Sequence, residues 1–189
     1  MFPDTVLRTE RLLLRPFTPD DAHDTWASCT DPDTQRWLPL PRPYTREAAT
    51  AWCTTASHAL RASGDGIHFA VAAPDGGRLL GTVGLKRTDW RARTSEVGYW
   101  VAPWARGRGI ATEATRTLAT WLLADRGFHR LELRAATGNT ASQRVAVKAG
   151  LRREAVLRNA GFVHEGRVDL VVFSLVRGDL ASGTFTAAE

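Results

Sequence analysis

The chain of 189 residues has two cysteines, two lysines and no long hydrophobic run. Cys29 and Cys53 form no C-x-x-C pair and have no clustered histidines beside them, so the sequence predicts neither a disulfide framework nor a metal site. No apolar run approaches the roughly 20 residues that a membrane-spanning helix needs. Residues Met1 to Asp4, acidic and proline-bearing, do not resemble a signal peptide. We therefore expect a cytoplasmic protein that does not associate with membranes.

Arginine carries nearly all of the positive charge, because Lys86 and Lys148 are the only lysines among 25 basic residues. The formal net charge is +5. The arginines are dispersed, with no dense basic run and no RNA-binding aromatic motif, so nucleic-acid binding is not expected but stays open as an alternative. A moderate positive field would also help to collect a ligand that carries several phosphate charges.

Hydrophobic periodicity and turn signals predict one mixed α/β domain over residues 1–177 and a disordered tail over 178–189. Seven strands are expected, over residues 6–17, 67–73, 78–86, 93–101, 130–135, 154–162 and 167–176. Four helices are expected, over residues 19–29, 46–62, 110–125 and 140–149. The helix over 110–125 connects two strands, so a ligand is expected at the carboxyl end of the strand before it.

A glycine-rich loop lies between that strand and that helix, and it is the most informative segment of the chain. The first amides of a helix have no partner within the helix and carry roughly half a positive charge, and glycines let a phosphate approach the backbone closely. We therefore expect the loop to bind an anionic cofactor. The candidate cofactor-binding residues here are Val101, Arg106, Gly107, Arg108, Gly109, Ile110 and Ala111.

Two common phosphate-binding motifs do not fit this loop. A P-loop requires Gly-Lys-Ser/Thr at its end, whereas this loop ends in Gly109-Ile110-Ala111. A dinucleotide fingerprint requires a third glycine where this chain has Thr112. Magnesium-nucleotide and dinucleotide chemistry are therefore disfavoured.

The pattern Arg106-x-x-Gly109-x-Ala111, with Pro103 before it, resembles the acetyl-CoA pyrophosphate loop of the GNAT acetyltransferase superfamily. The segments Thr9 to Pro16 and Asn139-x-x-Ser142 are similar to motifs of its RimJ/RimL-type branch, which acetylates protein N-terminal amines. The resemblance covers residues 9–176. It implies the single-domain GNAT fold, a mixed seven-stranded sheet flanked by about four helices. It also implies acetyl-CoA as cofactor, coenzyme A as product, and no metal.

The resemblance assigns residue roles as well. Asn139 would contact pantetheine, and Ser142 would lie near the thioester and donate a proton to the sulfur, although Ser142 could instead cap a helix. Glu154 and Glu96 are the candidate bases, and each could instead be a structural acid. Ala155 stands where related proteins carry a glycine after the glutamate. The implied reaction is direct attack of a primary amine on the thioester, with an oxyanion stabilised by a backbone N–H of residues 95–101.

The energetics of deprotonation bear on the acceptor. At neutral pH an α-amine loses its proton for about 1.4 kcal/mol and a lysine side chain for about 4.6 kcal/mol. A protein N-terminus or a small amine is therefore favoured, and residues 31–44, 88–93 and 159–166 are expected to form its pocket. A catalytically silent acyl-CoA sensor and a transferase that uses succinyl-CoA remain alternatives, and a homodimer stays open.

Overall fold

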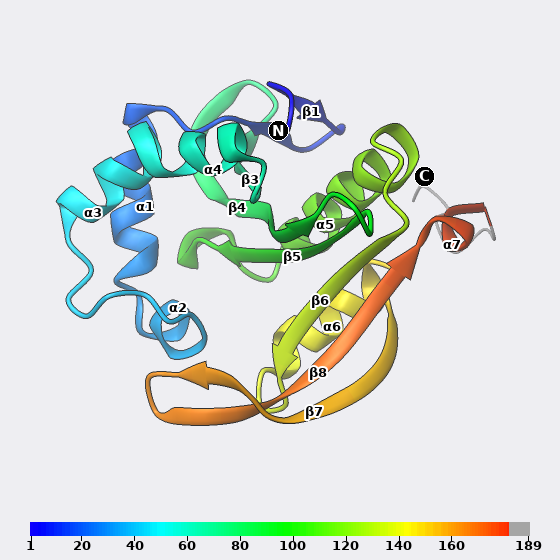
Figure 1. Ribbon diagram of the computed structural model, residues 1–189. Helices are drawn as coiled ribbons and strands as arrows, with labels where there is room; N and C mark the ends of the chain where they lie inside the picture. The colour runs from blue at the N-terminus through cyan, green and yellow to red at the C-terminus, as the bar shows by residue number, and fades with distance from the viewer. Residues whose placement is uncertain (182–189) are drawn as a thin grey trace.

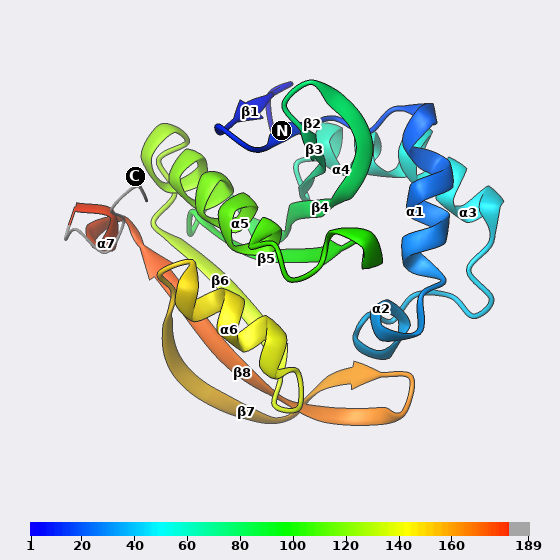
Figure 2. The ribbon, with the colours of Figure 1, turned by 180° about the vertical axis from the view of Figure 1, so that it is seen from behind.

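The computed structural model describes residues 1–181, which form one eight-stranded sheet with helices packed on both faces (Figures 1 and 2). The strands are β1 (Leu7–Arg8), β2 (Leu13–Arg15), β3 (Ile67–Ala73), β4 (Gly76–Asp89), β5 (Thr94–Val101), β6 (Arg130–Ala136), β7 (Arg152–Val163) and β8 (Gly166–Val176). The α-helices are α1 (Ala22–Cys29), α2 (Pro32–Trp37), α3 (Arg46–Ala51), α4 (Ser57–Ser63), α5 (Ile110–Thr120), α6 (Thr140–Lys148) and α7 (Arg177–Ala181). Shorter helical turns are η1 (Pro19–Asp21), η2 (Trp52–Ala56), η3 (Pro103–Ala105) and η4 (Trp121–Asp125).

The strand order is β1-β2-β3-β4-β5-β6-β8-β7, and every neighbouring pair is antiparallel except β5 and β6. The chain passes from β5 to its parallel neighbour through the glycine loop and α5, as the crossover pattern predicts. The expected mixed single-domain fold is therefore confirmed.

The helices cover the two faces of the sheet unequally. Helices α5 and α6 lie side by side on one face (Figure 2). On the other face, α4 packs against β3 and α1 against β4, whereas β6, β8 and β7 are seen in Figure 1 with no helix in front of them. The second half of the sheet is thus open on the face away from α5.

The main hydrophobic core lies between the sheet and α5. The helix presents Ala114 and Leu118, both almost fully buried, one turn apart on the same face. They belong to the same core cluster as Val83, Val97 and Leu131 of the central strands. This packing fixes the start of α5, and therefore the glycine loop, against the end of β5.

The prediction of one continuous strand over residues 6–17 is wrong, because this segment forms the two short strands β1 and β2. Between them the Thr9 hydroxyl accepts hydrogen bonds from the amides of Arg11 (3.2 Å) and Leu12 (2.9 Å), which closes a turn. This break explains why the sheet has eight strands and not seven.

The helix count also exceeds the prediction. The segment 31–44, expected to form part of the acceptor pocket and outside the four predicted helices, contains α2, whose N-cap Asp31 accepts a hydrogen bond from the Thr34 amide at 3.0 Å. Residues 46–62 are divided into α3, η2 and α4. None of the helices in residues 1–181 is long and apolar enough to cross a membrane.

The predicted disordered tail begins too early. Residues 177–181 form α7, and the buried carboxylate of Asp179 accepts the Val176 amide at 3.1 Å and pairs with Arg152 at 2.8 Å. Residues 182–189 lie outside the described part of the chain, so the prediction for them stays untested.

Replacing Leu118 by alanine should lower the free energy of unfolding by about 2–5 kcal/mol, because the side chain is fully buried and leaves a cavity in the core. Urea denaturation measures the change. The matched control is Thr120→Ala on the exposed face of the same helix, expected to change stability by no more than about 0.5 kcal/mol. Equal effects of the two substitutions would contradict this account of the core.

Candidate functional site

The central feature of the site is a V-shaped separation of β5 and β6. The two parallel strands pair only at Thr94 with Arg130, Ser95 with Leu131, and Glu96 with Glu132. Beyond these pairs β5 continues to Val101 beside β4, and β6 continues to Ala136 beside β8. The backbone edges that face each other past Glu96 are therefore free to bind a ligand.

The glycine loop lies at the end of β5, on the side where the V is open. Gly107 and Gly109 have φ of 76° and 78°, a left-handed conformation that favours glycine, and Gly109 is the N-cap of α5. Residues 106–109 are exposed, and the amides of the first turn of α5 point out of the helix end. The loop thus has the geometry of an anion site.

The N-terminal segment holds this loop in place, a contact that the sequence reasoning missed. Glu113, in the first turn of α5, is paired with Arg11 and accepts the Thr9 hydroxyl at 2.5 Å. The Arg11 guanidinium also donates to the Arg108 carbonyl at 3.4 Å. Glu113 would otherwise leave an uncompensated negative charge close to the proposed phosphate site.

On the opposite side of the V, the expected pair of residues starts helix α6. Asn139 is the N-cap of α6, and its side chain accepts the Ser142 amide at 3.0 Å. The Tyr99 hydroxyl, from β5, lies 2.9 Å from the Ser142 hydroxyl and donates to the Ser142 carbonyl at 3.2 Å. Tyr99 and Ser142 therefore bridge the two arms of the V.

Tyr99 keeps its proton at neutral pH. Burial raises the pKa of Tyr99 to about 12, and the hydrogen bond to Ser142 opposes this rise only in part. Because the phenol donates to the carbonyl of Ser142, the Ser142 hydroxyl can donate in turn to the phenol oxygen. The sequence alone does not indicate this contact, since Tyr99 and Ser142 are 43 residues apart along the chain.

Glu96 lies at the apex of the V, at the last position where β5 pairs with β6. Its side chain is 6% exposed and faces three cations: Lys86 at 3.1 Å, Arg87 at 2.8 Å and Arg134 at 3.6 Å. A buried carboxylate needs such compensation. Glu96 is thus a charged group at the point where the strands separate.

Glu154 lies elsewhere, on the edge strand β7. It accepts two hydrogen bonds from Arg130, at 2.9 and 2.5 Å, and one from the Ser174 hydroxyl at 2.6 Å. These bonds, with Arg130 as the largest cause, lower the pKa of Glu154 to about 2. Arg130 is at the beginning of β6, so Glu154 is near the closed end of the V and is not brought together with Ser142.

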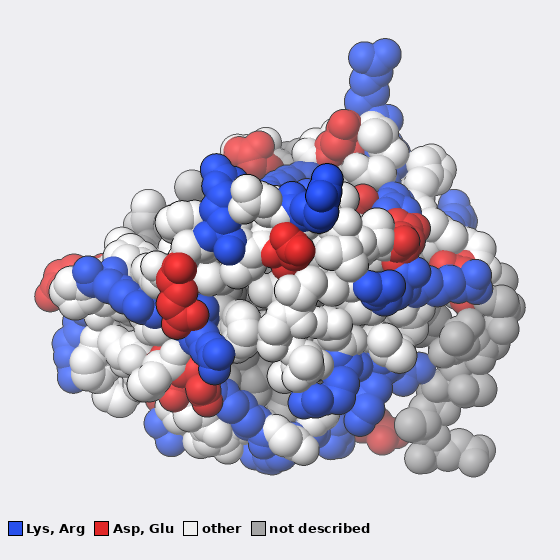
Figure 3. Space-filling view, turned by 90° about the horizontal axis from the view of Figure 1, so that it is seen from below, with Lys and Arg blue, Asp and Glu red and all other residues white. Residues whose placement is uncertain are grey.

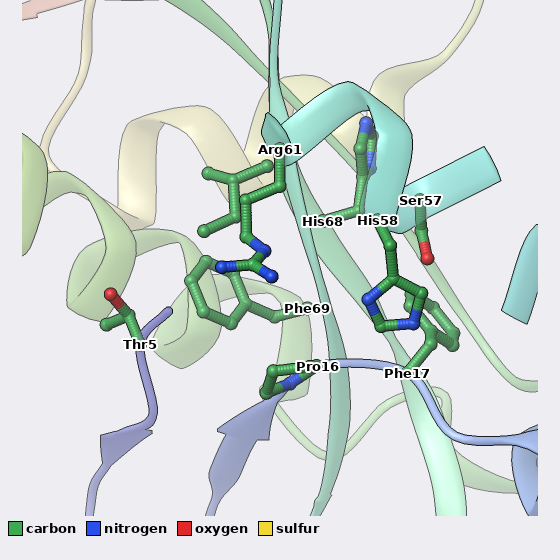
Figure 4. A pocket seen from close by; sticks show the side chains of 9 residues that line it. Thr5, Pro16, Phe17, Ser57, His58, Arg61, His68 and Phe69 are labelled. Atoms are coloured by element: carbon green, nitrogen blue, oxygen red, sulfur yellow. The ribbon is translucent and has the colours of Figure 1, made fainter. Parts of the chain in front are cut away.

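Two other hollows are distinct from the V. A cavity of about 10 Å³ between α4 and β3, lined among others by Ser57, His58 and His68, has room for about one water molecule (Figure 4). An open groove of about 400 Å³ between α6 and the β7–β8 pair carries Arg144, Lys148 and other residues, none of them from β5 or the glycine loop. Neither hollow is lined by Tyr99 or Ser142.

Comparison with known proteins identifies the fold and family. The sequence model described as "Acetyltransferase (GNAT) domain" matches residues 11–152. YoaA of Bacillus subtilis strain 168, an uncharacterized N-acetyltransferase, is 29% identical over 177 residues, which cover 94% of this chain and 98% of YoaA. The chain belongs to the GNAT acetyltransferase family. The expected resemblance is thereby confirmed, and with it an acetyltransferase that uses acetyl-CoA.

Solved structures agree on the fold. Mycobacterium smegmatis RimJ in complex with CoA-disulfide has a TM-score of 0.80 at 22% identity, covering 96% of this chain and 97% of its own. RimL, described as a ribosomal L7/L12 α-N-protein acetyltransferase in complex with coenzyme A, has a TM-score of 0.81 at 15% identity, covering 91% and 98%. At these identities the likeness shows the shared GNAT fold.

The residues around the glycine loop and β5 fit acetyl-CoA as the acetyl donor. A GNAT donor needs a pyrophosphate cradle and a strand edge for its pantetheine arm. Gly107 leaves open space where a Cβ would stand, and the edge of β5 past Glu96 has lost its parallel partner. The amides after Gly109 supply the positive end of a helix.

Gly109→Ala should weaken coenzyme A binding by about tenfold, because an alanine in the left-handed conformation costs about 1–2 kcal/mol and the loop would shift to avoid it. Titration calorimetry with coenzyme A measures the dissociation constant. Gly127→Ala is the matched control, since Gly127 has φ of 69° and lies after η4, away from the loop. An equal loss of affinity in both variants would refute a specific role of Gly109.

The ion pair of Glu154 should make a small, pH-dependent contribution to stability. The folded-state pKa of Glu154 is about 2, below its unfolded value of about 4.3, so the contribution is present above about pH 4.3 and lost as the pH falls toward 2. Since Glu154 is 41% exposed, solvent screening limits it to about 1 kcal/mol or less.

Thermal denaturation of Glu154→Gln should therefore show a lower Tm than the parent at pH 7, and the gap should narrow as the pH falls from 4 to 3. Glu165→Gln, at a residue that takes part in no ion pair within residues 1–181, is the control and should leave Tm unchanged. A gap that widens at low pH would contradict the direction of the pKa shift.

Proposed function

We propose that this acetyltransferase acetylates a primary amine, a protein N-terminus or a small amine, by direct attack on the donor thioester in a ternary complex. The main support is the hydrogen bond between Tyr99 and Ser142 across the open V, beside the unpaired edge of β5. Acetyl-CoA supplies an activated acyl group and a thiol leaving group. The chain must then bind the donor, accept the ammonium proton and return a proton to sulfur.

The binding residues are the glycine loop for the pyrophosphate and Asn139 with the edge of β5 for the pantetheine arm. Ser142 donates its one hydroxyl proton to the sulfur, and in that state the Tyr99 phenol donates to the Ser142 hydroxyl oxygen from the other arm. A backbone N–H of β5 past Glu96 stabilises the oxyanion.

We assign the base role to Glu96, acting through water, and a structural role to Glu154. Glu96 lies at the apex of the V, whereas Glu154 is bound by Arg130 and Ser174. A carboxylate whose pKa is about 2 is a poor acceptor for the proton of an α-ammonium group, whose pKa is near 8. Glu96 is itself paired with three cations, so its assignment rests on its position at the apex of the V and not on a comparison of basicity.

The charges around Glu96 bear on the class of acceptor. Lys86 and Arg87 supply two cations to one carboxylate, and the Lys86 ammonium lies 3.6 Å from where a Cβ would stand on Gly98, past the apex of the V. A local excess of positive charge favours an amine that carries a nearby carboxylate and disfavours polycations such as polyamines. An acidic peptide N-terminus fits this description.

The nucleic-acid alternative gains no support from the face of the molecule seen in Figure 3. On the face seen in Figure 3, acidic side chains lie among the lysine and arginine side chains, so the cations form no uninterrupted track. Electrostatic binding to a phosphate backbone depends on such a track.

The decisive experiment is thiol release, with mass spectrometry of products, over matched peptides beginning Ala-Glu or Ala-Lys, amino acids, polyamines and aminoglycosides. Acetyl-CoA and succinyl-CoA are each offered as donor. We expect acetyl transfer to α-amines, with the Ala-Glu peptide preferred. Donor binding with no turnover of any acceptor would favour a silent sensor, and turnover with succinyl-CoA alone would favour the succinyl alternative.

Ser142→Ala should lower kcat by about 10²-fold or more, the usual contribution of a positioned proton donor, with the dissociation constant of coenzyme A nearly unchanged. The Asn139 cap survives, because it uses the amide of residue 142. Thr137→Ala, which removes a hydroxyl from the loop between β6 and α6, is the control and should retain kcat. An unchanged kcat in Ser142→Ala would exclude the proposed donor.

A further inference from the structure

The short helix α2 lies at the open end of the V, between the end of β5 and the end of β6 (Figures 1 and 2). The loop after β5 is the glycine loop, and the loop after β6 leads to the Asn139 cap of α6. Specific contacts join α2 to each of these loops. The helix therefore spans the two arms that the sheet leaves separated.

The contact with the glycine loop is made by Arg106. Its guanidinium pairs with Asp31, donates to the Thr34 hydroxyl at 3.0 Å and reaches Asp33 at 3.3 Å. Burial of Asp31 raises its pKa, but hydrogen bonds from Arg106 and Thr34 outweigh burial and lower it overall. The positive charge of Arg106 is thus directed to the first turn of α2, not to the outer surface of the loop.

The contact with the other loop is made by Trp37, the last residue of α2. A Cβ placed on Gly138 would lie 3.3 Å from Cη2 of the indole and 3.8 Å from Cζ3. Gly138 therefore allows the ring to approach the backbone closely, one residue before Asn139. Arg36 lies over the indole, 4.9 Å from the ring centroid, and covers another part of it.

We infer that α2 is a crossbar that fixes the spacing of the two loops, and that Arg106 is a positioning residue for the acceptor end of the site. This inference rests on the proposed function for its acceptor side. The pyrophosphate is left to the backbone amides after Gly107 and to Arg108. The loop then has two separate functions: its backbone binds the donor, and the Arg106 side chain holds the wall against which the acceptor binds.

The test compares Arg106→Gln with Arg108→Gln. For Arg106→Gln we expect the dissociation constant of coenzyme A to change by less than about threefold, the acceptor KM to rise by about tenfold, and amide hydrogen exchange over residues 31–38 to accelerate by about tenfold. Arg108→Gln, in contrast, should weaken coenzyme A binding and leave amide hydrogen exchange in α2 unchanged. Arg106→Lys, which keeps the charge but not the forked geometry, should restore part of the protection.

A second variant separates the ion pair from the helix cap. Asp31→Asn removes the charge and retains an N-cap residue, so α2 should still form. The double variant Asp31→Asn/Arg106→Gln should then accelerate exchange little more than Arg106→Gln alone, because both substitutions break the same contact.

The inference is overturned if Arg106→Gln weakens coenzyme A binding by about tenfold while exchange in α2 is unchanged, since Arg106 would then be a phosphate ligand. The inference is also overturned if Asp31→Asn and Arg106→Gln have fully additive effects on amide hydrogen exchange in α2. If the parent protein turns over no acceptor, the proposed function fails. The exchange and binding measurements still decide whether α2 is a crossbar.

Discussion

The parallel contact between β5 and β6 is limited to three residue pairs, and the rest of the site depends on that limit. Each strand keeps its outer neighbour: β5 stays paired with β4 up to Val101, and β6 with β8 up to Ala136. The separation therefore costs only the bonds between the two inner edges, and leaves polar backbone groups that a ligand rich in amides can satisfy. A pantetheine arm carries such amides, and its thioester would lie beside the hydrogen-bonded pair of Tyr99 and Ser142.

The closed and open ends of the V differ in how their charges are used. From the closed end, charges alternate across β5, β6 and β7 through pairs of Glu96 with Arg134, Arg134 with Glu132, Glu132 with Arg130, and Arg130 with Glu154. This network lies on the face without helices and holds together the strands that meet at the apex. At the open end the ion pairs of Arg106 hold α2 against the glycine loop. The hydroxyls of Tyr99 and Ser142 and the backbone amides are left to donate hydrogen bonds to a donor molecule without displacing those pairs.

The parts of the fold that sequence could predict are those set by local physics. Gly107 and Gly109 adopt the left-handed conformation that glycine favours, and the helix after them starts at Ile110 as expected. The break at Thr9 depends on a side-chain hydrogen bond inside an apolar run, which alternation does not reveal. Helix α2 is absent from the predicted helices, because it is only six residues long and residues 31–44 hold four prolines, although Asp31 followed by Pro32 is a helix-start signal that could have found it.

The roles of the charged residues were harder to predict, because each depends on a partner far away in sequence. Glu154 looked like a candidate base until its position beside Arg130, 24 residues away, was known. Arg106 matched a phosphate-loop pattern, yet its side chain reaches Asp31, 75 residues away. A loop of this kind binds phosphate mainly through its backbone amides. The sequence pattern therefore predicts that the amides bind a phosphate, but it does not predict which residues the arginine side chain contacts.

Because the amides of the glycine loop bind the donor while its Arg106 side chain holds α2, donor binding and acceptor binding are coupled. Any ligand that drew the Arg106 guanidinium toward its phosphates would leave Asp31 and Asp33 facing each other without their shared cation and would loosen the start of α2. A donor bound by the amides alone leaves the crossbar intact, with Trp37 still against Gly138 and Asn139 still capping α6. The arrangement around Ser142 thus depends on the Arg106 side chain staying out of the phosphate site. Its ion pairs with Asp31 and Asp33 hold it away from that site.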